Sequence, residues 1–190
     1  MKNEISKLYK TGKTVFSTDD LASYFESDFK AIRRMISYYA STGVLRRVHK
    51  WIYVLGGESY DAMEMANKIM RPSYISLDTV LRREWVIFQY SEEITVVTYK
   101  TVSMCIDGKN LRFHFMKREI RENFEGVEYR DNISIASKER AFLDAIYLYK
   151  DFHFDNLSSI DWDKCFRISK IYGSKTLEKR LFHYHENYAQ

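Results

Sequence analysis

The first 57 residues carry an ordered series of local folding signals, and this order constrains the fold more than any other feature of the chain. Ile5, Leu8 and Tyr9 recur at helical spacing, which predicts a short first helix that ends near Gly12, and the extended apolar pair Val15-Phe16 follows. Ser17-Thr18-Asp19-Asp20 is an S-x-x-D capping box, which marks the start of a second helix. These signals predict a helix, a strand and a helix in succession.

A longer helix and a hairpin complete the pattern. Ser27 is a favourable N-cap for a helix that reaches about Ser41 and is stopped by Gly43. Residues 44–48 and 51–55 are predicted to be two strands joined across His49-Lys50. The resulting order is that of a winged helix-turn-helix. The inward stripe of the long helix is predicted to be Phe29, Ile32, Ile36 and Tyr39.

The same residues hold the chain's whole excess of positive charge. They contain ten lysines and arginines against five aspartates and glutamates, and the whole chain has a formal net charge of +4. Residues 58–190 therefore carry a net charge of −1. A small basic module on a near-neutral body is typical of a DNA-binding protein with a second domain. We expect a DNA-binding domain over residues 1–57 and another domain over 58–190, with Gly56-Gly57 as the hinge.

The outer face of the long helix offers polar side chains that can reach base edges and phosphates in a major groove. Arg33 or Arg34 can contact guanine in bidentate fashion, whereas Asp28 would repel phosphate if it faced the groove. The tip of the hairpin can contact the DNA backbone or the minor groove. The alternative is that this charge only solvates a helix face and a hairpin. The predicted DNA-binding residues are Ser27, Lys30, Arg33, Arg34, Ser37, Tyr38, Arg46, Arg47, His49 and Lys50.

Residues 58–190 are predicted to form a mixed α/β domain with an antiparallel sheet and flanking helices, so the fold class is α+β. Asp107-Gly108 is a hairpin turn signal, and Ser76 and Ser137 are predicted N-caps. The helix after Ser137 is apolar on several faces, which predicts a central, largely buried helix. The predicted helices are 60–70, 76–83, 137–149, 162–171 and 175–188, and the predicted strands are 85–88, 94–99, 102–106, 111–115, 126–129 and 133–135.

Composition and length exclude several classes. The chain is 45% hydrophobic and 29% charged, which is ordinary for a folded protein. Apolar stretches such as residues 141–149 are too short to span a membrane, and no apolar signal region follows the N-terminus, so we expect a cytoplasmic protein without a membrane partner. Cys105 and Cys165 stand alone, which implies neither a disulfide framework nor a zinc site.

Motifs for catalysis are weak, and we expect no catalytic residues, no metal and no cofactor. A nuclease needs clustered carboxylates and a lysine; Asp107, Glu119 and Glu122 are present without that pattern. The glycines of the hinge lack the Lys-Ser/Thr pair of a phosphate loop. His183 and His185 lie on different faces of a helix, and two surface histidines are the simpler interpretation.

Four ordered motifs lie in the body of the chain. Residues 66–77 have the sequence ANKIMRPSYISL, and residues 94–98 have the sequence ITVVT. Residues 113–124 and Gly126 carry an F-x-G stretch, and residues 135–144 have the sequence IASKERAFLD. Together with the winged helix, these motifs resemble the AbiEi-type antitoxins of abortive-infection toxin–antitoxin systems. The resemblance covers residues 10–150.

Many of the residues that the four motifs share with the AbiEi-type antitoxins are expected to serve the fold. Pro72 ends a helix, and Tyr74 and Leu77 are core candidates. Glu139, Arg140 and Asp144 could be catalytic in principle, but a partly buried ion-pair network that fixes helix packing is the preferred interpretation. The sequence departs from the family at residues 80–87, which lack its glycine and proline, and nothing matches after Lys150.

The resemblance implies an antitoxin that also represses its own operon by binding inverted repeats in its promoter DNA. It implies a phage-defence role and, as functional partner, a nucleotidyltransferase-like toxin. Antitoxins of this type are classed as type IV, so direct contact with the toxin stays open. The alternative is a stand-alone winged-helix transcriptional regulator whose second domain senses a ligand or dimerises.

Overall fold

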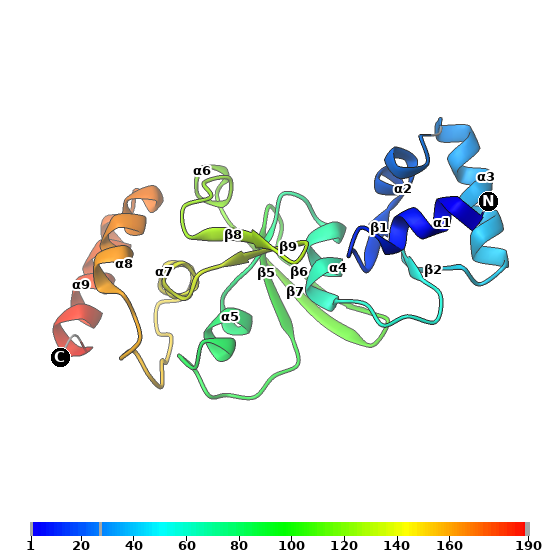
Figure 1. The fold of residues 1–190 in the computed structure, drawn as a ribbon. Helices are drawn as coiled ribbons and strands as arrows, with labels where there is room; N and C mark the ends of the chain where they lie inside the picture. Colours follow the sequence, from blue (N-terminus) through cyan, green and yellow to red (C-terminus); the bar gives the residue numbers. More distant parts are fainter. Residues whose placement is uncertain (1, 27, 189–190) are drawn as a thin grey trace.

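The computed structural model describes residues 2–26 and 28–188, and within these ranges the chain is a mixed α+β protein with two sheets (Figure 1). The helices are α1 (Lys2–Tyr9), α2 (Thr18–Phe25), α3 (Phe29–Ser41), α4 (Ala62–Ile69), α5 (Asp78–Arg83), α6 (Arg118–Arg121), α7 (Lys138–Leu148), α8 (Trp162–Ser169), the 3-10 helix η1 (Lys170–Tyr172) and α9 (Lys175–Tyr188). The strands are β1 (Val15–Ser17), β2 (Leu45–His49), β3 (Ile52–Leu55), β4 (Tyr74–Ile75), β5 (Ile94–Thr98), β6 (Val102–Ile106), β7 (Lys109–Phe115), β8 (Val127–Arg130) and β9 (Ile133–Ala136).

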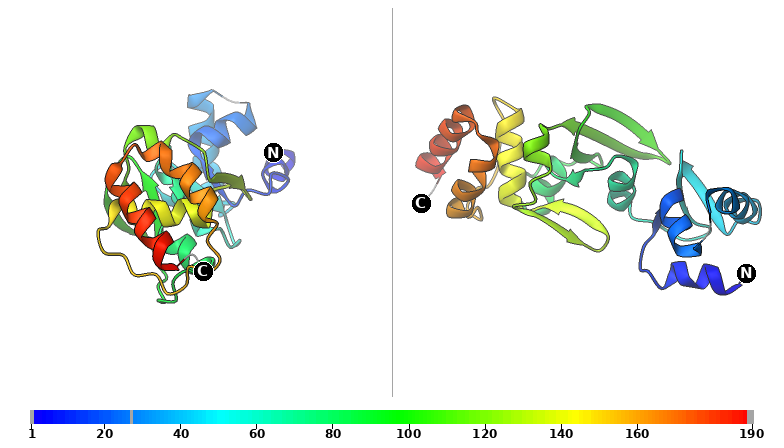
Figure 2. Two further views of the ribbon diagram at one scale, coloured as in Figure 1. Left: turned by 90° about the vertical axis from the view of Figure 1, so that its left-hand side faces the viewer. Right: turned by 90° about the horizontal axis from the view of Figure 1, so that it is seen from above.

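The molecule is elongated (Figures 1 and 2). The head (residues 2–26 and 28–57) lies at one end, and α8 and α9 lie at the other. The six-stranded sheet occupies the middle of the body (residues 58–188), with α7 between this sheet and the two C-terminal helices. No helix in the described part of the chain is both long enough and apolar enough to cross a membrane.

The start of α2 follows the predicted capping box. The Ser17 hydroxyl accepts a hydrogen bond from the Asp20 amide at 3.1 Å, and the Asp20 carboxylate accepts one from the Ser17 amide at 2.8 Å. Each residue thereby satisfies a backbone group that the first helical turn leaves unpaired. This local prediction is confirmed.

The N-cap predicted for α3 is wrong by one residue. Asp28 takes this role, because its carboxylate accepts hydrogen bonds from the amides of Lys30 at 2.8 Å and Ala31 at 2.7 Å. A carboxylate at this position also interacts favourably with the helix dipole. Asp28 therefore stabilises the helix start, and Ser27 itself lies outside the described residues.

The three-stranded antiparallel sheet of the head has the order β1-β3-β2, and its central strand β3 is buried on both faces. Tyr53 and Leu55 of β3 join the core that α2 and α3 cover. Ile52 and Val54 point to the opposite face and join the larger core of the body, where α4 packs against β1 and β3. Because side chains alternate along a strand, one short strand contributes to two cores.

The sheet of the body is mixed, so the prediction of an antiparallel sheet is wrong. Its order is β6-β7-β5-β4-β9-β8, with β5 parallel to β7 and β4 parallel to β9. The Asp107-Gly108 hairpin forms as predicted, with positive φ at both turn residues. However, β7 inserts between β5 and β6. Leu111 and Phe113 of β7 are fully buried, whereas Ile106 is the one buried residue of β6, which agrees with the interior position of β7 and the edge position of β6.

Two further local predictions are wrong. Residues 85–88 form no strand; Val86 and Ile87 are buried in a loop, and both amides donate to the Leu81 carbonyl. Their apolar character serves burial rather than strand pairing. Ser76 does not cap α5, because its hydroxyl donates instead to the Asp144 carboxylate at 2.7 Å.

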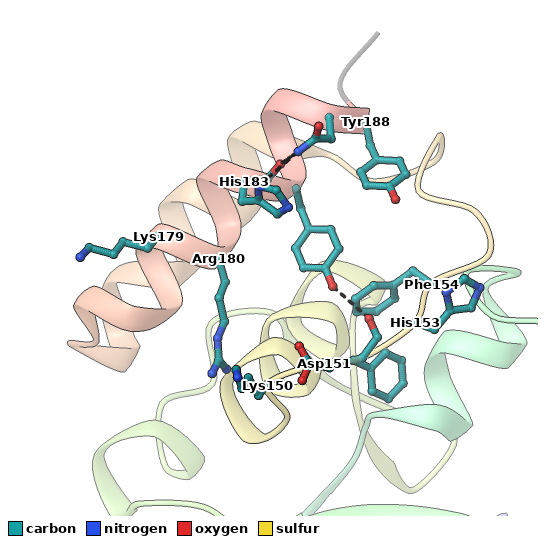
Figure 3. A pocket seen from close by; sticks show the side chains of 11 residues that line it. Lys150, Asp151, His153, Phe154, Lys179, Arg180, His183 and Tyr188 are labelled. Atoms are coloured by element: carbon teal, nitrogen blue, oxygen red, sulfur yellow. Dashed lines mark hydrogen bonds between the residues drawn. The ribbon is translucent and has the colours of Figure 1, made fainter.

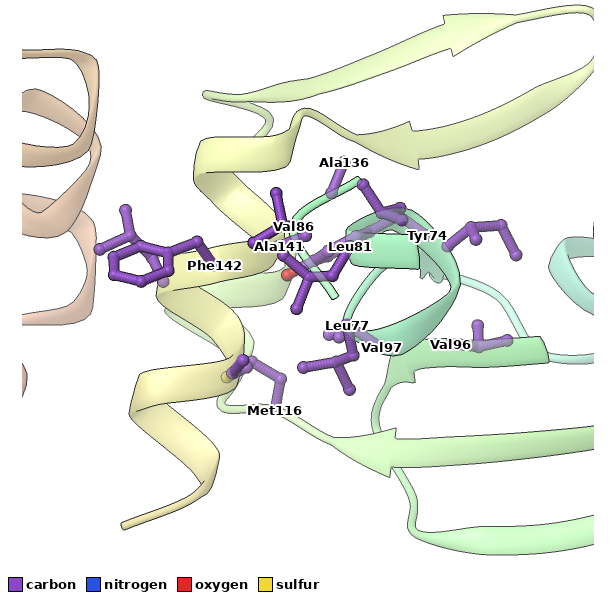
Figure 4. Packing of buried hydrophobic residues seen from close by; sticks show 14 of the residues in the cluster. Tyr74, Leu77, Leu81, Val86, Val96, Val97, Met116, Ala136, Ala141 and Phe142 are labelled. Carbon is purple, nitrogen blue, oxygen red and sulfur yellow. The ribbon is translucent and has the colours of Figure 1, made fainter. Parts of the chain in front are cut away.

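Helix α7 is central and largely buried, as predicted, and residues 139–146 are all buried. Ser137 caps it by accepting a hydrogen bond from the Arg140 amide at 3.3 Å. Ala141 packs toward the sheet, while Phe142 projects toward the C-terminal helices (Figure 4). There its ring lies 5.9 Å from the ring of Trp162 and 5.5 Å from that of Tyr184.

Candidate nucleic-acid interface

One face of α3 carries exposed polar and basic side chains, and the other face is buried. The exposed residues recur at positions i, i+3, i+4, i+7 and i+8, which places them on a single helix face. They are Lys30, Arg33, Arg34, Ser37 and Tyr38. Ile32, Ile36 and Tyr39 on the opposite face pack into the core of the head. The helix is thereby held rigidly while its basic face stays open to solvent.

The β2–β3 hairpin adds an aromatic side chain beside this face. Trp51 is 44% exposed, and its ring centroid lies 5.9 Å from the Arg33 guanidinium and 5.6 Å from the Lys50 ammonium. The Trp51 carbonyl accepts a hydrogen bond from the Thr18 amide at 3.0 Å, which ties the hairpin tip to the start of α2. Sequence reasoning missed Trp51, although a tryptophan directly after Lys50 at the predicted hairpin turn was a usable signal.

The remaining hairpin residues differ in whether their side chains are already bound to other parts of the chain. Arg46 forms an ion pair of 2.9 Å with Asp107 at the β6–β7 turn of the body. Tyr60 donates a second hydrogen bond to the same carboxylate at 2.8 Å, and burial together with this bond raises the pKa of Tyr60 to about 12. Arg47 donates to the His49 carbonyl at 3.4 Å, and His49 is half-buried. Lys50 is the hairpin cation that shares the Trp51 ring with Arg33 of the α3 face.

Polar contacts also join the head to the body through α4. The Glu64 carboxylate accepts hydrogen bonds from the Thr14 amide at 2.9 Å and the Thr14 hydroxyl at 2.7 Å. The Lys68 ammonium lies 2.6 Å from the Asp20 carboxylate of the capping box. Burial raises the pKa of Glu64, whose second carboxylate oxygen has no hydrogen-bond partner among the described residues. These contacts hold α2 and β1 against the body.

The body contains a buried polar network around Arg140. Its guanidinium lies 3.4 Å from the Asp144 carboxylate and donates to the Tyr74 hydroxyl at 2.8 Å. Further hydrogen bonds reach backbone carbonyls of residues 120, 123 and 125. The Asp144 carboxylate also accepts hydrogen bonds from Ser76 and, at 2.7 Å, from Tyr172. Glu139 is separate from this network and pairs with Lys164 at 2.8 Å.

Three of the four motifs of the body meet at this network. The first contributes Tyr74 and Ser76, and the fourth contributes Arg140 and Asp144. The third contributes the carbonyls that Arg140 contacts, and Gly126 of the same stretch has a φ of +75°. A Cβ at Gly126 would lie 2.9 Å from Ile168 and 3.0 Å from Arg140, so the packing favours glycine there. The arrangement fixes the relative positions of α7, β4 and the loop after α6.

Threonines of the second motif anchor the neighbouring segments. The Thr95 hydroxyl donates to the Ser76 carbonyl at 2.6 Å, and the Thr98 hydroxyl donates to the Pro72 carbonyl at 3.0 Å. Both threonines are buried on β5. Their hydrogen bonds connect β5 to the chain on either side of β4, so this motif also serves packing.

The carboxylates and histidines considered for catalysis are dispersed. Asp107 pairs with Arg46, whereas Glu122 pairs with Arg118 and Arg121 on α6. His183 lines a cavity of about 870 Å³ between α9 and the loop after α7 (Figure 3).

Arg180 and Tyr184 join the walls of this cavity. The Tyr184 hydroxyl donates to the Phe152 carbonyl at 2.9 Å, and the Arg180 guanidinium donates to the carbonyls of Ile146 and Tyr149. These bonds attach α9 to the end of α7.

The predicted DNA-binding residues that stay exposed and lie together are thus those on the face of α3, with Trp51 and Lys50 beside it. Arg46 is instead paired with Asp107 of the body. Neither a protein-family model nor a curated protein matches this chain.

Proposed function

We propose that the head is a winged helix-turn-helix that binds double-stranded DNA, with α3 in the major groove and the β2–β3 hairpin as the wing. The order α1, β1, α2, α3, β2 and β3 supports this proposal. The observation that carries it is the exposed basic face of α3 with Trp51 and Lys50 alongside. Arginine side chains on such a face can hydrogen-bond guanine edges, and lysines can neutralise phosphates.

The protein's role is that of an antitoxin of the AbiEi type that represses its own operon. The resemblance of the four motifs supports this part, and the exposed α3 face supplies a means of binding promoter DNA. Two copies would bind inverted repeats as two half-sites. The functional partner is a nucleotidyltransferase-like toxin, which the antitoxin opposes with or without direct contact.

The DNA-binding proposal is tested by Arg33→Ala/Arg34→Ala, measured by gel shift on the DNA upstream of the protein's own gene. Each lost base contact costs about 1–3 kcal/mol, so the affinity falls by at least about tenfold. Lys170→Ala/Lys175→Ala is the matched control, because both lysines are exposed at the far end of the molecule and the net charge changes equally. Equal affinities of the two double variants would contradict the α3 assignment.

Antitoxicity is tested by co-expression with the neighbouring toxin gene in cells. Deleting the head is a poor test, because Ile52 and Val54 belong to the core of the body. The full-length Arg33→Ala/Arg34→Ala variant is better, since it keeps the fold and removes DNA contacts. Protection by this variant, with derepression of a promoter reporter, supports two separable activities. Absence of any nucleotidyltransferase gene beside this one would favour the stand-alone regulator.

A further inference from the structure

A cavity of about 550 Å³ lies where the head meets the body, away from α3. The head contributes Lys13 and Asp20 to its lining. The body contributes α4, the turn at residues 71–73, Phe124 and the β8–β9 hairpin. A cavity of this volume is within the range of small-molecule sites.

Positive charge exceeds negative charge in this cavity. Its described lining contains three cationic side chains, Lys13, Lys68 and Arg71, and one carboxylate, Asp20. That carboxylate is already engaged, because it lies 2.6 Å from the Lys68 ammonium and 4.0 Å from the Lys13 ammonium, and it accepts a hydrogen bond from the Ser17 amide at 2.8 Å. Arg71 is exposed and makes no hydrogen bond or ion pair with another described residue. An anionic group in the cavity would therefore meet an available guanidinium.

Two aromatic rings face the same space. Phe124, in the loop after α6, is 69% exposed, and Tyr129 of β8 is 70% exposed. Neither ring belongs to the hydrophobic cores of the chain. Rings left open to solvent beside cationic groups suit a ligand that joins a planar base to a phosphate, because bases stack on aromatic side chains.

The walls of the cavity are held by hydrogen bonds, so the space exists without a ligand. The Asn67 side-chain carbonyl accepts from the Ser134 amide at 2.8 Å, which fixes α4 against β9. The Asn132 side-chain amide donates to the Gly12 carbonyl at 3.2 Å, which connects the β8–β9 turn to the head. A ligand here meets a largely preformed site.

We propose that this cavity binds a nucleotide, with Arg71 and Lys13 at the phosphate and Phe124 stacked on the base. The site is independent of the proposed DNA binding, because none of these residues lies on α3. Its position between head and body means that the ligand would contact both parts at once. Occupancy therefore raises the thermal unfolding temperature, since the ligand binds only the folded arrangement.

The test is isothermal titration calorimetry of the full-length protein with adenosine and guanosine 5′-monophosphates, with adenosine and with inorganic phosphate. We expect saturable binding of a nucleotide and binding at least about tenfold weaker for phosphate or adenosine alone. The proposal would be overturned if neither nucleotide showed saturable binding. Phosphate that binds as tightly as a nucleotide would overturn the base-stacking part.

Variants locate the site. Arg71→Ala and Phe124→Ala should each weaken nucleotide binding by about tenfold, because each removes one contact to phosphate or base. Arg83→Ala and Phe115→Ala are matched controls, since both residues are exposed and lie outside the cavity. Arg33→Ala/Arg34→Ala must bind the nucleotide as the wild type does. Weaker nucleotide binding by Arg33→Ala/Arg34→Ala, or unchanged binding by Arg71→Ala and Phe124→Ala, would place the ligand elsewhere.

Discussion

Arginines on α3 and α7 illustrate two opposite uses of the same charge. Arg33 and Arg34 lie on an exposed helix face, whereas the Arg140 guanidinium is completely buried. Arg140 is surrounded by hydrogen-bond acceptors from the Asp144 carboxylate, the Tyr74 hydroxyl and backbone carbonyls. A charge whose partners are all internal stabilises the fold, while a charge left at the surface is available to an external anion. The difference teaches that partner geometry, and not residue type, separates the structural arginine from the candidate binding residues.

The largest effect is expected at Arg140. Arg140→Ala leaves the Asp144 carboxylate buried without its cation, which should lower the free energy of unfolding by about 3–5 kcal/mol. Urea unfolding followed by circular dichroism measures this loss. Arg34→Ala is the control and should stay within about 0.5 kcal/mol of the wild type. Similar free energies of unfolding for Arg140→Ala and Arg34→Ala would mean that Arg140 is no more important to the fold than a surface arginine.

Lys68 is an intermediate case, since it pairs with Asp20 between head and body. Lys68→Met should lower the free energy of unfolding at neutral pH by about 1–3 kcal/mol, because Asp20 loses a charged hydrogen bond. Burial raises the pKa of Asp20, but the bonds from Lys68 and Ser17 lower it more, so the net shift is downward.

The sign of this pKa shift adds a pH test. A lowered folded pKa gives stability that is present above the unfolded value of about 4 and is lost as pH falls through the folded value. Urea unfolding at several pH values should show a smaller acid-induced loss in Lys68→Met than in the wild type. Identical pH profiles would mean that this ion pair does not stabilise the junction.

Trp51 tests whether the surroundings of the exposed α3 arginines contribute to DNA binding. Trp51→Ala removes the ring beside Arg33 and Lys50, and we expect DNA affinity to fall about two- to fivefold. Gel shifts at fixed salt concentration measure this change. Trp85→Ala is the matched control, because Trp85 is 72% exposed in a loop of the body. A larger loss for Trp85 would move the interface away from the head.

The smallest effect is expected at Asp107, which engages Arg46. Asp107→Asn should free this arginine and raise DNA affinity about twofold, with a steeper dependence on salt. Asp131→Asn is the control, since Asp131 is exposed in the β8–β9 turn. Weaker DNA binding by Asp107→Asn would mean that the ion pair positions the hairpin for DNA rather than withholding Arg46.

Local signals were the predictable part of this fold. The capping residues Ser17 and Ser137 and the Asp107-Gly108 turn acted as expected, because each satisfies backbone groups a few residues away. Residues 85–88 were mistaken for a strand, since apolar residues buried in a loop have the same local pattern. The N-cap of α3 is Asp28 and not Ser27. Serine and aspartate are both favoured at this position, so the sequence alone does not distinguish two such neighbours.

Long-range features were not predictable from the pattern. The insertion of β7 between β5 and β6 depends on which strand is buried most deeply in the finished sheet. The pairing of Lys68 with Asp20 and the approach of Trp51 to Arg33 join residues distant in sequence. The exposed face of α3 was predictable because helical periodicity alone determines it. The cavity at the junction was not, since it exists only where two parts of the chain meet.

Strand β3, which is buried on both faces, has a consequence for assembly on DNA. Because β3 belongs to the cores on either side, the direction of α3 is fixed relative to the body. In two copies bound to repeated half-sites, the bodies would then follow the phase of the double helix. Inserting about 5 base pairs between the half-sites, half a helical turn, would turn the two bodies to opposite sides of the DNA. The relative orientation of the two bodies would thus depend on the number of base pairs between the half-sites.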